Sequence, residues 1–218
     1  CLLDRLYRSF DTHLDPLGLY KIETIGDAFI VMGGMPTAES RAGGETGKAA
    51  LKLAGAEATV RMALAMVDEI ALVGEETGIP FTMRLGVHTG TVVGGIIGWK
   101  RPRYFVWGAD TVIGSAMESG GHPAQINVSS FTMEVLRASR QGYYFDTHRE
   151  IVVGGATVPC AYLRGDNKRM VLPPGMDVEV VKKAMDVGRL LSPTHRGLSL
   201  HVPQRALRGL PLEGGPRG

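Results

Sequence analysis

The sequence is short of cysteine, has little net charge and lacks a long apolar run. Cys1 and Cys160 are its only two cysteines, too few for a disulfide framework, and no C-x-x-C pair suggests a zinc site. Lys and Arg number 24 and Asp and Glu 22, so the net charge of +2 gives no case for nucleic acid or an anionic membrane surface as a partner. No apolar run reaches the roughly 20 residues of a membrane-spanning helix. What remains is the composition of an ordinary globular domain, 44% hydrophobic and 21% charged.

Two common nucleotide-binding signatures are absent as well. The sequence contains no G-x-x-x-x-G-K-[ST] loop, and no G-x-G-x-x-G follows a strand and opens a helix. Helical segments alternate with hairpin strands rather than with single parallel strands. The pattern therefore argues against a doubly wound nucleotide fold. It favours an α+β, ferredoxin-like sandwich, in which helices pack on a mainly antiparallel sheet.

Hydrophobic periods and turn residues predict the individual elements. Helices are expected over residues 1–12, 47–76, 109–119 and 130–139, the last with Ser129 as its N-cap. Strands are expected over residues 19–23, 28–32, 81–87, 91–97, 104–107 and 125–128, then near Tyr143, Ile151 and residues 158–163. The strands over 81–87 and 91–97 should form a hairpin around His88-Thr89-Gly90. Residues 37–46 are expected to be a loop.

The two ends of the sequence carry different signals. An amphipathic helix that starts at residue 1, with no initiator Met, indicates a fragment of a longer protein. Residues 166–191 are interpreted as a C-terminal extension with one possible helix over 178–191. Residues 192–218 are rich in Gly, Pro and Arg without a sustained period, so we expect a disordered tail.

One carboxylate stands out because it separates two apolar runs. In YKIETIGDAFIVMGGMP, residues 20–36, Asp27 follows Ile25-Gly26 and precedes Ala28-Phe29-Ile30. Asp is a common turn residue, which would explain it without any function. A metal ligand held over a nucleotide would explain it too. The residues of this stretch alone leave both interpretations open.

Three motifs in order make the chain resemble a known family. They are K-I-E-T-I-G-D-A at residues 21–28, M-R-L-G-V-H-T-G at 83–90 and V-G-G-I-I-G at 93–98. P-R-Y at 102–104, W-G at 107–108 and M-E-S-G-G at 117–121 extend the match. The sequence resembles the class III nucleotide cyclases, which are the adenylyl and guanylyl cyclases. The resemblance covers residues 1–165 and implies a cyclase catalytic domain whose first strand is missing.

The resemblance implies a reaction and a set of site residues. The family cyclises ATP or GTP, with the 3′-hydroxyl attacking the α-phosphorus and pyrophosphate leaving, and it uses two divalent ions, Mg²⁺ or Mn²⁺. Asp27 matches the second of two metal aspartates, and the first would lie upstream, outside this chain. Arg84 matches an arginine that binds the terminal phosphates, a role suited to a guanidinium fork. Gly26 lies in the nucleotide-binding turn, whereas His88 is expected to be a turn or core residue rather than a ligand.

Several positions depart from the pattern of homodimeric members. Val112 and Ala116 stand where that pattern has an Asn and an Arg, and Val153 stands in place of a Lys. Apolar side chains neither donate hydrogen bonds nor offset phosphate charge. Glu23 matches a residue that reads guanine in guanylyl cyclases, but Phe105, at the second base-reading position, has no polar side-chain atom. Asp110 and Glu118 are expected to cap and solvate their helix.

These departures lead to a specific prediction. The chain is expected to be the metal-bearing half of a dimeric site. Its partner would be a second cyclase domain, in a homodimer or a heterodimer, and the heterodimer is favoured because an unlike domain would supply the missing polar groups. We expect it to act in intracellular signalling, in the cytoplasm at the face of a membrane, as part of a larger protein. The alternative is a non-catalytic cyclase-like module that dimerises with and regulates a true cyclase. A diguanylate cyclase is a weaker alternative, because the sequence lacks a G-G-[DE]-E-F signature.

Overall fold

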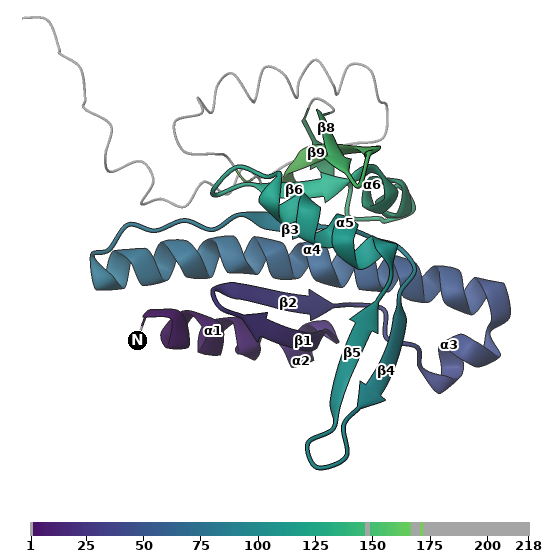
Figure 1. Cartoon of the computed structure of the whole chain (residues 1–218). Helices are drawn as coiled ribbons and strands as arrows, with labels where there is room; N and C mark the ends of the chain where they lie inside the picture. The colour runs from purple at the N-terminus through teal and green to yellow at the C-terminus, as the bar shows by residue number, and fades with distance from the viewer. Residues whose placement is uncertain (1, 147–148, 167–170, 172–218) are drawn as a thin grey trace, which may run out of the picture.

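The computed structural model describes residues 2–146, 149–166 and 171. Its longest element is helix α4, Gly44–Thr77, which runs across the whole molecule in Figure 1. The middle of α4 supplies much of the core, with Val60, Met62 and Val73 almost fully buried. The helix ends at Gly78, whose φ of 67° is the left-handed conformation that glycine adopts readily at a helix C-terminus.

Two short helices and a hairpin pack beside α4. Helix α1, Leu2–Thr12, buries Leu6 and Phe10 in the core, and α2 covers Leu14–Leu17. Strands β1, Tyr20–Ile25, and β2, Ala28–Met32, pair antiparallel as a two-stranded sheet. Helix α3, Ala38–Ala42, follows and leads directly into α4.

The remaining strands form two further sheets among the described residues. Strand β3, Leu85–Val87, pairs parallel with β6, Ile126–Ser129, which pairs antiparallel with β9, Ala156–Gly165. Strands β7, Tyr144–Phe145, and β8, Arg149–Val153, both pair with β9 and complete a five-stranded sheet. Strands β4, Val93–Ile97, and β5, Arg103–Trp107, form a separate hairpin that projects from the body in Figure 1.

Two helices connect these sheets. Helix α5, Ala109–Ser119, follows the β4–β5 hairpin and packs directly on β3. This contact is close, because a Cβ built on Gly86 would lie 2.2 Å from the backbone nitrogen of Glu118. Helix α6, Ser130–Leu136, begins after Ser129, whose hydroxyl accepts a hydrogen bond from the Thr132 amide.

The α+β class and the order of the main elements are confirmed, but some details were wrong. Residues 81–87 and 91–97 do not form a hairpin; β3 pairs with β6 and β4 with β5. Residues 37–46 are largely helical, because Thr37 and Ser40 form a capping box that starts α3. The predicted single sheet is divided into three among the described residues. The helix expected over 178–191 and the tail over 192–218 lie outside the described residues. Within the described residues, no helix is long and apolar enough to cross a membrane.

Candidate functional site

Asp27 lies on the tight turn between β1 and β2. Ile25 pairs with Ala28, so Gly26 and Asp27 alone form the loop. The backbone φ is positive at Gly26, 60°, but not at Asp27, as in a type II′ hairpin turn, whose first position favours glycine. Asp27 is exposed. Burial and, second, the nearby charge of Asp27 raise the pKa of Tyr7 on α1, which places this carboxylate near the phenol.

The described residues do not complete a metal site around Asp27. Mg²⁺ and Mn²⁺ prefer several oxygen ligands, among which carboxylates are usual. Among the residues that the structure describes, no group of three His, Cys, Asp or Glu side chains is arranged to hold a metal ion. Asp27 therefore presents one accessible carboxylate, and the described part of the chain does not build a metal centre by itself.

Arg84 is held by a side chain that the sequence had not linked to it. Its Nε donates to Oε1 of Glu118 on α5 at 2.7 Å, and the side chains are 47% and 42% exposed. The expectation that Glu118 caps its helix was wrong, because its carboxylate forms an ion pair with the residue that precedes β3, but the side chain is partly exposed to solvent as expected. Glu118 belongs to the M-E-S-G-G motif, but no local pattern connects it to a residue 34 positions earlier.

The predicted metal and phosphate residues lie on different parts of the fold. Asp27 lies on the β1–β2 hairpin, and Arg84 precedes β3 of the five-stranded sheet. In the view of Figure 1, α4 runs between that hairpin and that sheet. No hydrogen bond or ion pair links Asp27 with Arg84 in the described structure. The described structure thus does not bring Asp27 and Arg84 into contact.

The two candidate base-reading residues lie on hairpins that touch. Glu23 is half-buried on β1, and Phe105 is half-buried on β5, where its ring stacks on Trp107 with 5.9 Å between centroids. Tyr20 and Tyr104 form an edge-to-face contact at 5.5 Å that joins β1 to β5. The structure therefore brings the strands of Glu23 and Phe105 together, although Phe105 offers only a ring face.

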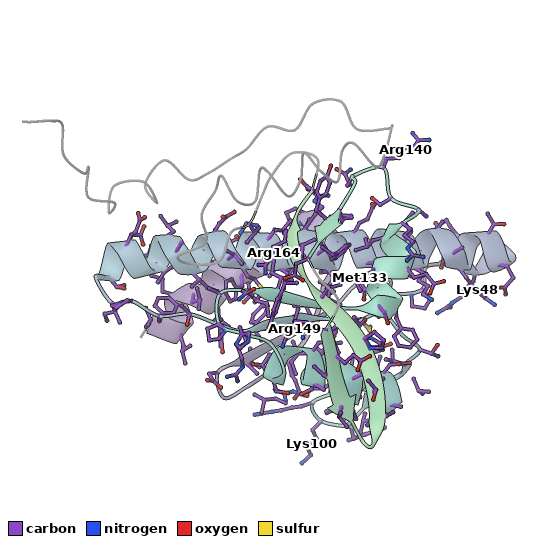
Figure 2. The ribbon with its side chains drawn as sticks, turned by 90° about the horizontal axis from the view of Figure 1, so that it is seen from above. Lys48, Lys100, Met133, Arg140, Arg149 and Arg164 are labelled. Carbon is purple, nitrogen blue, oxygen red and sulfur yellow. The ribbon has the colours of Figure 1, made fainter. Side chains whose placement is uncertain are left out.

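The three apolar residues that were expected to replace polar catalytic groups differ in their exposure. Val112 on α5 is 59% exposed, while Ala116 and Val153 are half-buried. Four other apolar side chains of the preceding hairpin are also exposed: Val93, Ile96, Ile97 and Trp107. At the hairpin tip Trp99 is 96% exposed, and Figure 2 shows Lys100 pointing away from the body. Several large apolar side chains exposed along one hairpin are a feature seen at protein–protein interfaces.

A buried polar network fixes the start of α5. The His88 side chain is 3% exposed, and its two ring nitrogens lie 3.0 Å from Oδ1 of Asp110 and 2.8 Å from Oγ of Ser129. The Thr91 amide donates to the other Asp110 oxygen at 2.6 Å. The expectation that Asp110 caps its helix was therefore wrong, because it ties α5 to the loop after β3. Gly90 is needed there, since a Cβ would lie 2.1 Å from Cγ of Asp110.

This network predicts that the stability of the fold decreases at acidic pH. The His88 hydrogen bond, helped by Thr91 and opposed by partial burial, holds the pKa of Asp110 below its ordinary value of 3.8. A lowered pKa stabilises the fold fully above the unfolded-state pKa, and that contribution is lost as the pH falls through the folded-state pKa. We expect Asp110→Asn to be about 1–3 kcal/mol less stable at neutral pH. Its unfolding free energy should also fall less steeply in acid than that of the wild type.

Urea unfolding between neutral pH and about pH 3 would measure this difference. Asp15→Asn is the matched control, because Asp15 is an exposed carboxylate on the short helix α2. Parallel stability curves for the wild type and Asp110→Asn would show that the network contributes nothing to acid stability.

Comparisons with known proteins match most of the chain. The model of the adenylate and guanylate cyclase catalytic domain matches residues 1–166. Human guanylate cyclase soluble subunit alpha-2 is 34% identical over 149 residues, which are 68% of this chain and 19% of that protein. Guanylate cyclase alpha of Plasmodium falciparum is 37% identical over 161 residues, 73% of this chain and 4% of that protein. The chain therefore spans less than a quarter of the length of these relatives.

Solved structures agree in fold. The guanylate cyclase domain of RhGC from Catenaria anguillulae, solved in complex with GTP, aligns with a TM-score of 0.59 at 23% identity, covering 75% of this chain and 82% of that one. The adenylyl cyclase CyaB from P. aeruginosa aligns with a TM-score of 0.60 at 20% identity, covering 74% and 80%. At these identities the likeness shows a shared fold.

Proposed function

The chain belongs to the adenylate and guanylate cyclase catalytic domain family, and from this premise we propose that it is the metal-bearing half of a dimeric purine nucleotide cyclase. The substrate is ATP or GTP. The products are the 3′,5′-cyclic nucleotide, formed when the 3′-hydroxyl attacks the α-phosphorus, and pyrophosphate. The names of the curated relatives favour GTP, and the acceptor carboxylate of Glu23 complements the donor edge of guanine.

The chain's own residues have distinct roles in this proposal. Asp27 supplies one carboxylate toward two divalent ions, Mg²⁺ or Mn²⁺, and a second aspartate outside this sequence supplies another. Such ions, when bound, neutralise phosphate charge and lower the pKa of an attacking hydroxyl. Gly26 sets the turn that presents Asp27. Arg84 binds the terminal phosphates and thereby stabilises the charge of the leaving pyrophosphate.

One observation carries the half-site assignment. Apolar side chains are exposed both on the β4–β5 hairpin and on α5, where Val112 is aligned with a polar catalytic position of homodimeric members. An unlike partner domain docked there would cover these side chains and bring the Asn, Arg and Lys that this chain lacks. A location at the cytoplasmic face of a membrane stays a prediction.

The proposal predicts activity only in a mixture of two unlike domains. The full-length protein is assayed with Mn²⁺ and with ATP and GTP separately, first alone and then mixed with a partner domain that carries the missing Asn and Arg. Turnover only in the mixture supports the half-site and identifies the base. Turnover by the protein alone would contradict it, because it would mean that Val112, Ala116 and Val153 do not stand at the polar positions.

A second candidate function rests on the same three residues. The loss of three polar groups together is also what a non-catalytic module that regulates a true cyclase would show. No turnover in any mixture, with dimerisation still detected by analytical ultracentrifugation, would favour that module over the enzyme.

A further inference from the structure

Arg84 uses one edge of its guanidinium for a protein contact and leaves another edge available. An arginine has five N–H donors in a fixed planar arrangement. The Nε–H bonds Glu118 at 2.7 Å, and it is the one hydrogen bond or ion pair of Arg84 that the described structure records. Because the guanidinium is planar, anchoring Nε limits the directions in which the two terminal amino groups can point.

The part of α5 that carries the Glu118 carboxylate is held in place by β3 and β6. Glu118 lies near the end of α5, whose backbone contacts β3 at Gly86 so closely that a Cβ has no room there. In the next strand of the sheet, Nδ2 of the fully buried Asn127 donates to the carbonyl of Met117 at 2.9 Å. Met117, the residue before Glu118, is therefore hydrogen-bonded to β6, and the backbone of Glu118 itself packs against β3.

An arginine held in this way binds an anion with less loss of freedom. A free arginine side chain has about 2 kcal/mol of rotamer entropy to lose on binding. The charge of Glu118 works in the opposite direction, because it repels phosphate, but at this exposure solvent screens it. Orientation and repulsion can be separated, since glutamine keeps the acceptor oxygen and removes the charge.

We propose that Glu118 is a positioning residue, which holds Arg84 through Nε so that its terminal amino groups face the β- and γ-phosphates of the substrate. The inference rests on the proposed function for the identity of the ligand, a nucleoside triphosphate. It adds a residue of α5 to the phosphate site, where the sequence alone indicated only Arg84.

Binding of inorganic tripolyphosphate to the full-length protein, measured by isothermal titration calorimetry, tests this without needing turnover. We expect Glu118→Ala to raise the Kd about 5- to 10-fold, which corresponds to a loss of about 1 kcal/mol of binding free energy when Arg84 is no longer oriented. Glu118→Gln should raise it less than about 2-fold, because its amide oxygen still accepts from Nε. In an Arg84→Ala background, Glu118→Ala should have no further effect.

Thermal unfolding of the same variants separates positioning from a general loss of structure. We expect the unfolding temperature of Glu118→Ala to stay close to that of the wild type, since the pair is half exposed. The proposal is overturned if Glu118→Ala binds tripolyphosphate as tightly as the wild type, or if the wild type does not bind it. It is also overturned if Glu118→Ala raises the Kd equally in the presence of Arg84 and in the Arg84→Ala background. A wild type that binds tripolyphosphate but forms no cyclic nucleotide would count against the proposed function and leave this inference standing.

Discussion

In the full-length protein with its partner domain, Asp27→Ala is expected to abolish cyclic-nucleotide formation, lowering kcat by roughly 100-fold or more, the scale of losing one preorganised electrostatic group. The physical reason is local. Asp27 is exposed on a two-residue turn, and the described residues contain no cluster of carboxylates that could take over its role. The measurement is turnover with Mn²⁺ under saturating nucleotide.

Controls separate loss of a ligand from loss of the turn. Asp15→Ala removes another exposed carboxylate and should leave turnover within about 2-fold of the wild type, as is usual for surface changes away from a site. Asp27→Asn keeps the turn residue type but weakens the ligand, so it should resemble Asp27→Ala. Unchanged turnover in Asp27→Ala would contradict the assignment of Asp27 as a metal ligand. Its preference for the turn would then be the reason that an aspartate stands at this position.

The largest expected effect on stability is at Gly86, where no side chain fits. A Cβ there would lie 2.2 Å from the Glu118 nitrogen and 2.6 Å from the Met117 carbonyl carbon, both backbone atoms that cannot rotate away. We expect Gly86→Ala to destabilise the fold by about 3 kcal/mol or more, because β3 and α5 must separate. Chemical denaturation of the wild type and the variant measures the difference.

Gly95→Ala is the matched control for that substitution. Gly95 is also a strand glycine without a positive φ, but its Cβ would meet only the Trp107 ring at an ordinary 3.6 Å. Its stability should stay within about 1 kcal/mol of the wild type. Equal effects of the two substitutions would mean that the contact between β3 and α5 is not tight in solution.

Much of the local structure was predictable because its causes lie within a few residues. The amphipathic period of residues 2–12 and the glycine after α4 define those helices, and Ser129 caps α6 as predicted. Gly26-Asp27 lies between two runs of strand-forming residues, which predicts the β1–β2 hairpin. In that hairpin Asp27 is exposed, as a metal ligand must be. Helix α3 was missed, since its capping box uses Ser at the position where Glu or Gln is usual.

Strand pairing was less predictable because it depends on distant partners. The His88-Thr89-Gly90 segment looks like a hairpin turn in isolation. In the fold, His88 and the Thr91 amide bond Asp110, so the loop is directed toward α5 rather than back along β3. β3 then pairs with β6, some 40 positions later, which buries Leu85 and Val87.

The sequence by itself determined the α+β class, most of the longer helices, the Gly26-Asp27 turn, the family and the residues on which the proposed chemistry depends. Only the tertiary structure decided which side chains meet. It paired Arg84 with Glu118 and enclosed His88 between Asp110 and Ser129, and it placed Asp27 on a different sheet from β3, the strand that Arg84 precedes. The physical reason is range: helix periods, caps and tight turns arise from neighbours in the chain, whereas ion pairs across elements arise from how the core packs.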